Sequence, residues 1–314
     1  MVKYFKKESG EVLEIKSSKE NNWINISPPF NPKNLKKVSE AQKIPLDFLI
    51  DSLDVDERSR YELEEDVTLV VLKTPFEEES EDNDDTFFKT IPLGLVLKPN
   101  LIVTISAYDN PIIEAFINNK VKEFNPSDRN QFVLQIFERT SLSFLQYLKG
   151  IDAKRTLLEH DLRSSLQNEK LFNLQSIEKS LVYFVTSIRS NELMMMKLHR
   201  TNILEFNEEE LDILQDIIVD NSQALEMSNI YTNILKSTMD SFASIISNNL
   251  NVVIRRLTTV TIILMIPTLV ASFYGMNITH LPFKENPLAL AYAIGFSLLL
   301  IFGIVWFFRR MRWF

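Results

Sequence analysis

The sequence predicts an α/β cytoplasmic domain followed by long α-helices that continue into a two-span transmembrane helical region. Three observations predict this fold class. Short runs of β-branched residues recur in the first 125 residues, and the 116 residues of Ile151–Ile266 contain neither Gly nor Pro. Two apolar segments near the C-terminus, 257–283 and 286–308, contain no Asp, Glu, Lys or Arg.

The N-terminal part alternates predicted strands with predicted helices. The strands are expected at Glu11–Lys16, Trp23–Ser27, Val67–Lys73, Ile91–Leu97 and Leu101–Ser106. Lys98-Pro99-Asn100 lies between the last two and predicts a hairpin loop. The helical patterns lie at Asn34–Gln42, Pro45–Leu53 and Pro111–Asn118.

The run without Gly and Pro is expected to be almost entirely α-helical. Breaks are expected near Gln167–Lys170 and near Thr201–Asn207. Asn207-Glu208-Glu209-Glu210 predicts a helix start, with an Asn cap and acidic residues in the first turn. No residue before Pro267 would end this helix, which at ~1.5 Å per residue would be about 100 Å long if it reaches Tyr274.

Both apolar segments have the length of a membrane span. As helices, Leu257–Tyr274 would measure about 27 Å and Leu288–Phe308 about 31 Å, against a hydrocarbon core of roughly 30 Å. The first eight residues lack an apolar region, so no signal peptide is expected. Basic residues flank the spans on the side away from the connecting loop: Arg255, Arg256, Arg309, Arg310 and Arg312. By the positive-inside rule, the chain is a multi-pass protein of the cell membrane with both termini cytoplasmic.

Composition excludes several classes of function. The net charge of −8 disfavours binding to nucleic acid, and the absence of Cys excludes thiol catalysis and zinc-thiolate sites. His160, His199 and His280 are scattered, and no phosphate-binding loop or nucleophile motif occurs, so an enzyme is not expected. The segment Asp51–Asp85 holds fifteen acidic residues against three basic ones. It predicts a solvated loop at Glu77–Asp85 or, alternatively, a reservoir for divalent cations.

The first span carries a polar stripe. A heptad register places Asn251, Thr258, Met265 and Ser272 at one position and Ile254, Thr261, Thr268 and Gly275 at its companion position. Such a seam predicts packing against copies of itself, and its polar content indicates that the copies surround an aqueous path. The opposite face (Ile262, Ile263, Leu264, Leu269, Val270, Phe273) suits lipid or the second span. The alternative for the hydroxyl residues is a bond back to the helix or contact between helices.

The outer end of the first span has the sequence Tyr274-Gly275-Met276-Asn277, and a polar amide at this position points to cation transport. Together with the two spans, the short outer loop and the basic tail ending in Trp313-Phe314, it resembles the CorA family of magnesium transport proteins. The resemblance extends over essentially the whole chain. It implies a homopentamer in the lipid bilayer, whose pore is lined by five copies of the first span.

The resemblance also implies roles for individual residues. Gly275, Met276 and Asn277 would form the selectivity filter, with the Asn side chains in a ring at the outer mouth. The other pore-lining residues, from the resemblance and the seam together, are Asn251, Ile254, Leu257, Thr258, Thr261, Met265, Thr268 and Ser272. The transported ion would be Mg²⁺, which a ring of amides can hold through its own water shell.

A regulatory role for internal Mg²⁺ also follows from the resemblance. Asp216 falls where the family has an acidic sensor residue, and Asp220 lies one turn further along. Glu77 or Glu78 is the expected partner from the α/β domain. Arg309, Arg310 and Arg312 would form a basic ring around the pore stem, or alternatively bind lipid headgroups.

The alternatives are a related zinc, cobalt or nickel transporter of the same fold and a membrane-anchored scaffold that conducts nothing. Co²⁺ and Ni²⁺ are alternative cargo even for a magnesium transporter. The expected segments are a cytoplasmic α/β domain 1–125, an antiparallel long-helix segment 126–206, a stalk helix 207–256, the pore-lining span 257–277, an external loop 278–287, a second span 288–308 and a basic cytoplasmic tail 309–314.

Overall fold

The computed structural model describes residues 1–8, 11–15, 22–78, 87–164, 168–276 and 287–311. The chain divides into two compact units, Met1–Lys236 and Ser237–Phe314. One helix, α6 (Glu208–Gly275), begins in the first unit and ends in the second.

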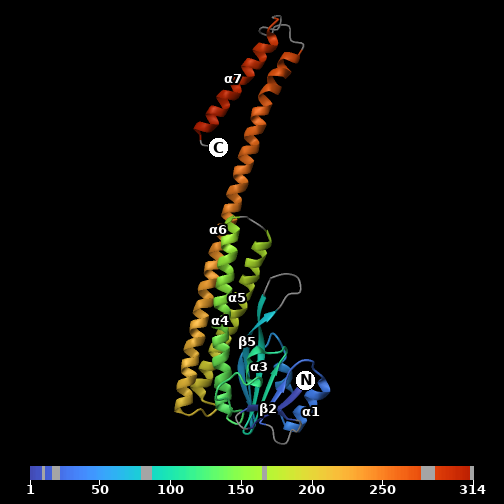
Figure 1. Cartoon of the computed structure of the whole chain (residues 1–314), viewed down its shortest axis with the longest axis vertical. Helices are drawn as coiled ribbons and strands as arrows, with labels where there is room; N and C mark the ends of the chain where they lie inside the picture. The colour runs from blue at the N-terminus through green and yellow to red at the C-terminus, as the bar shows by residue number, and fades with distance from the viewer. Residues whose placement is uncertain (9–10, 16–21, 79–86, 165–167, 277–286, 312–314) are drawn as a thin grey trace. The chain divides into compact units, whose positions relative to one another are not determined.

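The first unit contains a seven-stranded sheet (Figure 1). Its strands are β1 (Val2–Glu8), β2 (Glu11–Ile15), β3 (Trp23–Ile26), β4 (Arg60–Glu64), β5 (Val67–Glu78), β6 (Phe87–Lys98) and β7 (Leu101–Ser106). Their order across the sheet is β2-β1-β3-β7-β6-β5-β4. All neighbours are antiparallel except β3 and β7, which pair in parallel with Ile24 opposite Val103.

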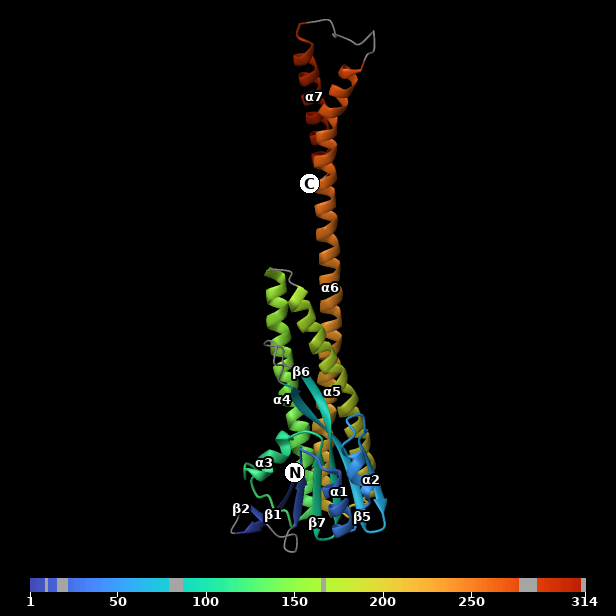
Figure 2. The ribbon, with the colours of Figure 1, turned by 90° about the vertical axis from the view of Figure 1, so that its right-hand side faces the viewer.

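Helices lie on both sides of this sheet (Figure 2). The short helices are α1 (Pro32–Gln42), α2 (Leu46–Asp51) and α3 (Pro111–Ile117). The long ones are α4 (Arg129–Ser164), α5 (Asn168–Thr201) and α6, and the second unit adds α7 (Ala289–Arg310). The run without Gly and Pro is therefore helical as predicted, with breaks after Ser164 and after Thr201.

The sheet separates two apolar cores, and the alternation of side chains along β5 assigns residues to each. Leu69 and Val71 join the core beneath α1 and α2, whereas Val70 and Leu72 join the core beneath α3, α4, α5 and α6. All four side chains are fully buried. A strand covered on both faces needs apolar residues at consecutive positions, which is the pattern of Leu69–Leu72.

Trp23 organises the larger core. Its ring centroid lies 4.7 Å from that of Phe5, 5.1 Å from that of Phe132 and 5.7 Å from that of Phe124. Its indole Nε1–H donates to Thr104 Oγ1 at 2.9 Å, which satisfies the one polar group of a fully buried side chain. The cluster joins the sheet to α4 and to the segment that precedes it.

The predicted start of α6 is confirmed in atomic detail. Asn207 Oδ1 accepts from the Glu210 N–H at 2.9 Å, and Glu210 Oε2 accepts from the Asn207 N–H at 2.8 Å. This reciprocal pair is a capping box, and it satisfies two backbone donors that the helix leaves unpaired. Asn130 Nδ2 also donates to Glu210 Oε2 at 3.1 Å, which fastens the start of α4 to the start of α6.

The predicted strands and short helices are all present, and the hairpin loop lies where Lys98 pairs with Leu101. The sequence did not predict β1 and β4. The prediction of a loop beginning at Glu77 was wrong for Glu77 and Glu78, because β5 continues to Glu78, opposite Phe87. The rest of that predicted loop, 79–86, lies outside the described residues. Pro75 does not end β5. At this position β5 pairs only with β6, because its pairing with β4 extends no further than Val71, and a proline without an N–H is tolerated on such an unpaired edge.

Asn191 of α5 takes the place of a strand partner at this edge. Its Nδ2 donates to the Lys73 carbonyl at 2.8 Å, and its Oδ1 accepts from the Lys73 N–H at 2.9 Å. Two more α5 side chains bind β6: Ser180 Oγ accepts from the Phe88 N–H, and Ser187 shares a hydrogen bond with Thr90. Because β4 reaches only as far as Val71, Asn191 satisfies the two backbone groups of Lys73 that lie just beyond it.

We therefore expect Asn191→Ala to destabilise the first unit. The change leaves one buried N–H and one buried carbonyl of Lys73 unpaired, at about 1–3 kcal/mol each. Hydrogen exchange followed by mass spectrometry should show faster exchange in 72–78. Gln175→Ala, which removes an exposed amide from the same helix, is the control. Equal exchange in the two variants would contradict the role assigned to Asn191.

Candidate functional site

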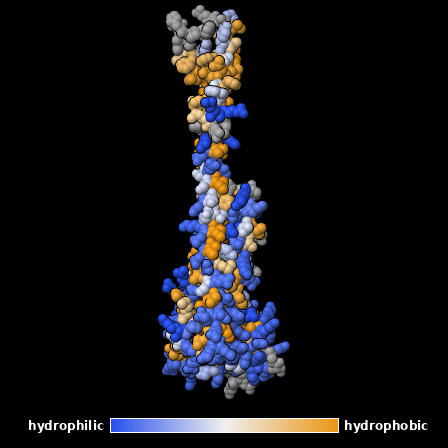
Figure 3. All heavy atoms as spheres, turned by 90° about the vertical axis from the view of Figure 1, so that its left-hand side faces the viewer, coloured by the Kyte–Doolittle hydropathy of each residue, from blue (hydrophilic) through white to orange (hydrophobic). Residues whose placement is uncertain are grey.

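The second unit carries the apolar surface of the molecule. The C-terminal part of α6 and the whole of α7 are long and apolar enough to cross a membrane, by length and composition. Figure 3 shows an apolar surface over this unit, with hydrophilic residues where it ends. Arg255 and Arg256 on α6 and Arg309 and Arg310 on α7 are exposed near these ends. Arg312 lies outside the described residues.

One face of α6 is covered within the second unit. Thr259 is 1% exposed, and Ile266 and Val270 are also buried. Further toward the end of α6, a groove of about 580 Å³ is lined by Val270, Phe273 and Tyr274 from α6 and by residues of α7 that include Gly295. Both ribbon views place α7 alongside this part of α6 (Figures 1 and 2). This face therefore belongs to the contact with the second helix.

The predicted seam lies on a different face, and it is exposed in the single chain. Leu257 is 67% exposed and Met265 is 63% exposed. The other described members are exposed too: Asn251, Ile254, Thr258, Thr261, Thr268, Ser272 and Gly275. At about 100° per residue, the middle of the seam lies roughly 130° around the helix from Thr259, Ile266 and Val270. The helix thus turns its seam away from α7.

The hydroxyl groups of the first span bond back to their own helix. Thr258, Thr261 and Thr268 donate to the carbonyls four residues earlier, at 2.9, 2.9 and 3.1 Å. Each hydroxyl therefore uses its single proton within the helix, as in the alternative given for these residues, and its oxygen can still accept further hydrogen bonds. The seam consequently offers hydrogen-bond acceptors to whatever lies against it. It suits a partner that donates, such as the polarised water around a cation.

A hollow along the exposed side widens the seam beyond the residues that sequence periodicity selected. It has a volume of about 710 Å³ and is lined by Thr261, Met265, Thr268, Ser272 and four apolar neighbours. Three of these neighbours, Ile262, Leu264 and Leu269, were assigned to the opposite face by the sequence. The helical angle favours the seam for Leu264 and Leu269 only, because both lie closer to it than to the face that α7 covers.

The terminal motif is described only in part. Gly275 is the last residue of α6, and the Met276 N–H donates to the Phe273 carbonyl at 3.3 Å. Met276 is exposed. Asn277, the residue from which a selectivity ring was predicted, lies outside the described residues.

The predicted regulatory carboxylates lie in the first unit. Asp216 is exposed and Asp220 is half-buried, one turn apart on α6, and Glu77 is exposed on β5. The side chain of Glu78 lies outside the description. Among the described residues, no three acidic or histidine side chains lie close enough together to hold a metal ion. One copy of the described chain therefore does not assemble such a site from Asp216, Asp220 and Glu77.

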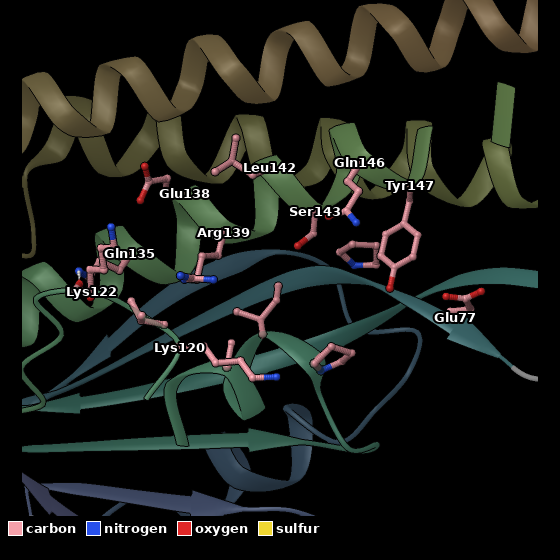
Figure 4. A pocket seen from close by; sticks show the side chains of 15 residues that line it. Glu77, Lys120, Lys122, Gln135, Glu138, Arg139, Leu142, Ser143, Gln146 and Tyr147 are labelled. Atoms are coloured by element: carbon pink, nitrogen blue, oxygen red, sulfur yellow. Dashed lines mark hydrogen bonds between the residues drawn. The ribbon is translucent and has the colours of Figure 1, made fainter. Parts of the chain in front are cut away.

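Glu77 lines one side of a cavity, beside Tyr147 and apart from the cationic residues Lys120, Lys122 and Arg139 (Figure 4). The cavity has a volume of about 770 Å³. Arg139 points into the space between α4 and the sheet, with its guanidinium carbon 5.7 Å from the centroid of the Phe116 ring. Burial, with a smaller contribution from Glu77, raises the pKa of Tyr147. The described lining holds three cationic residues against two acidic ones, Glu77 and Glu138, and this positive balance disfavours a divalent cation inside the cavity.

Comparison with known proteins identifies the family. A family model described as "CorA-like Mg2+ transporter protein" matches residues 18–310. A cobalt/magnesium transport protein CorA from Methanocaldococcus jannaschii is 28% identical over 295 residues, which cover 93% of this chain and 90% of that protein. A protein of the same name from Thermotoga maritima is 21% identical over 308 residues, covering 96% of this chain and 86% of that protein.

The fold agrees over the whole chain. The solved structure of the CorA magnesium transporter from Methanocaldococcus jannaschii matches with a TM-score of 0.82 and 25% sequence identity, and it covers 100% of this chain and 99% of the other. An α/β domain, long helices and two apolar helices at the C-terminus are common to both. With its family model matched over nearly its full length, the chain belongs to the CorA family.

Proposed function

We propose that this protein is a passive Mg²⁺ channel of the cell membrane, built as a homopentamer with five copies of α6 around the conduction path. The observation that carries the proposal is the exposed seam of α6, whose threonine hydroxyls donate to their own helix and can act toward other groups only as acceptors. In lipid, such polar groups must face protein or water. Packing the seams of several copies around one axis meets this requirement.

The chemistry of the seam fits a hydrated ion. Mg²⁺ gives up its water reluctantly and prefers octahedral oxygen coordination. Acceptor oxygens from Thr258, Thr261 and Thr268 can hold the hydrogens of that water without replacing it. The exposed apolar side chains of Ile254, Leu257 and Met265 would form rings that close the path by excluding water. The membrane potential then supplies the driving force.

At the outer mouth, the ring of Asn277 amides would select the ion. Amides accept hydrogen bonds from the coordinated water and bind weakly enough to release the ion. A ring of carboxylates would bind a divalent cation more tightly and slow its release. Gly275 and Met276 would hold the turn that carries the ring.

Asn277→Ala should therefore abolish selective Mg²⁺ uptake into vesicles, and Asn277→Asp should slow it. Flux is measured with a fluorescent Mg²⁺ indicator inside vesicles held at a negative potential. Asn286→Ala removes an amide from the same connecting segment and is the matched control. Undiminished, selective uptake by Asn277→Ala would end the proposal for this residue.

The absence of native cysteine allows the two faces of α6 to be compared directly. In membranes, Thr268→Cys on the seam should react with a charged, water-soluble thiol reagent, and Val270→Cys on the face toward α7 should not. The expected difference in labelling rate is about tenfold or more, because a thiol ionises and reacts only where water reaches it. Equal rates at the two positions would argue against a wet axis along the seam.

Internal Mg²⁺ would regulate the channel through carboxylates on neighbouring copies. Because no three such groups gather within one described chain, Asp216 and Asp220 of one copy would need Glu77 or Glu78 of the next. Ions that bind better to the closed arrangement would shift the population toward it. Without ions, repulsion between the carboxylates would separate the copies.

Asp216→Ala should weaken the protection that Mg²⁺ gives against limited proteolysis of the purified protein. The Mg²⁺ concentration for half-protection is expected to rise about tenfold, since one charged ligand is lost. Asp212→Ala removes an exposed carboxylate one turn earlier on α6 and is the control. Identical protection curves for the two variants would remove Asp216 from the regulatory site.

Cobalt is a second candidate cargo, favoured by the name "cobalt/magnesium transport protein" that two relatives carry. Vesicle flux with Co²⁺ as competitor would rank the two ions. The same assay separates transport from a non-conducting anchor, for which an exposed polar seam has no evident use.

In this proposal both termini lie on the cytoplasmic side, because basic residues flank the two spans there: Arg255, Arg256, Arg309 and Arg310. Arg309, Arg310 and Arg312 would form a basic ring.

A further inference from the structure

Lys73 is a buried cation with no counter-ion in contact among the described residues. The residue is 8% exposed and lies on β5 next to the Asn191 contact. In the described part of the chain, its ammonium has one hydrogen-bond partner, the Val55 carbonyl, and no ion pair. Two of its three N–H donors therefore remain open. Burying a charge without a close partner costs several kcal/mol in general, so the arrangement calls for an explanation.

The nearby acidic residues do not supply the missing partner. Asp54, Asp56 and Glu57 attract the ammonium through space, and Glu57 is already paired with Arg60 at 2.9 Å. Burial nevertheless outweighs this attraction and lowers the pKa of Lys73. The part of the chain that the structure describes thus leaves the charge on Lys73 incompletely compensated.

A second lysine of the same sheet shows what full satisfaction requires. Lys98 on β6 donates to the carbonyls of Gln42 and Lys43 at 3.1 and 3.3 Å, and its ammonium lies 3.6 Å from Asp66. Lys73 is more deeply buried than Lys98 and has fewer partners. The difference between them lies in what each ammonium faces, because Lys73 lines a cavity.

That cavity has a volume of about 470 Å³, within the ~300–1,000 Å³ typical of small-ligand sites. It lies in the first unit, between β5, β6, α5 and the segment after α2. Four charged residues line it, of which Arg58, Lys73 and Lys89 are cationic and Asp56 is acidic. Arg58 is exposed at the rim and forms no ion pair among the described residues. The net lining charge is positive, in a chain whose net charge is −8.

Aromatic rings form another part of the wall. Phe76 and Tyr108 pack together with their ring centroids 5.2 Å apart, and both line the cavity. Tyr108 and Tyr183 are partly exposed there. A flat ring can stack on such a surface, as nucleic-acid bases stack on aromatic side chains of proteins.

From these observations we infer that the cavity beside Lys73 binds a mononucleotide, with its phosphate at Lys73 and Arg58 and its base against the aromatic wall. The phosphate would supply the acceptors that the two open N–H groups of Lys73 lack. The guanidinium of Arg58 can bind the same group through two parallel hydrogen bonds. This inference does not depend on the proposed transport, since its test measures binding alone.

The test uses the full chain in detergent micelles and three probes: AMP, adenosine and inorganic phosphate. Calorimetric titration should show AMP binding at least tenfold more tightly than either fragment, because only AMP engages both walls. Lys73→Met and Arg58→Gln should each weaken AMP binding about tenfold or more, the range for a lost hydrogen bond to a charged group. Tyr108→Ala should weaken AMP and adenosine but leave phosphate unchanged.

Lys98→Met is the matched control, because it removes a satisfied lysine of the same sheet outside the cavity. It should leave AMP binding unchanged. If Lys73→Met fails to fold, Arg58→Gln decides, since Arg58 is exposed and bears no structural contact in the described residues. Absence of AMP binding at millimolar concentration, phosphate binding as tight as AMP, or equal losses in Arg58→Gln and Lys98→Met would overturn the inference.

Discussion

The structure depends on a single uninterrupted helix that must present different faces to different surroundings. In the first unit, α6 buries Leu214, Asn221, Ser228 and Leu235, which are spaced by seven residues. In the second unit it buries Thr259, Ile266 and Val270 and exposes the seam. A helix satisfies nearly all of its own backbone hydrogen bonds, so it can pass from a polar to an apolar environment, which no loop could do. In α6 the exception is the Ile263 carbonyl, because Pro267 has no N–H to donate to it.

The same constraint explains how polar side chains are used on this helix. Asn221 is fully buried and donates to the Ile188 carbonyl at 3.0 Å, which ties α6 to α5. In the second unit the hydroxyl groups of Thr258, Thr261 and Thr268 donate hydrogen bonds to carbonyls of their own helix. Toward other groups, these hydroxyls can therefore act only as acceptors. Polar residues thus join helices in one unit and leave an acceptor surface in the other. For the transport that we propose, such a surface needs no movement of side chains to receive a hydrated ion.

The α/β domain meets a different constraint at the edge of its sheet. β4 pairs with β5 only as far as Val71, and the N–H and carbonyl of Lys73 on that edge bind Asn191 of α5 instead of a strand. Asn191 supplies both a donor and an acceptor there, so a helix completes the sheet. This junction also fixes the backbone of Lys73, whose side chain faces the cavity for which we infer a nucleotide. Lys73 therefore takes part both in the contact between α5 and the sheet and in the candidate nucleotide site.

The amino-acid sequence alone determined the helices, the apolar segments and the seam, because these follow from local spacing: Gly and Pro are absent over Ile151–Ile266, and Asn207 with Glu210 caps α6 within four residues. It missed β1 and β4, and it ended β5 too early. Strand bounds depend on partners distant in sequence, such as Phe88 opposite Glu77. Only the tertiary structure decided that α7 lies against the face containing Thr259 and that Lys73 is buried beside Val55. Both result from packing between segments far apart in the chain, which periodicity does not encode.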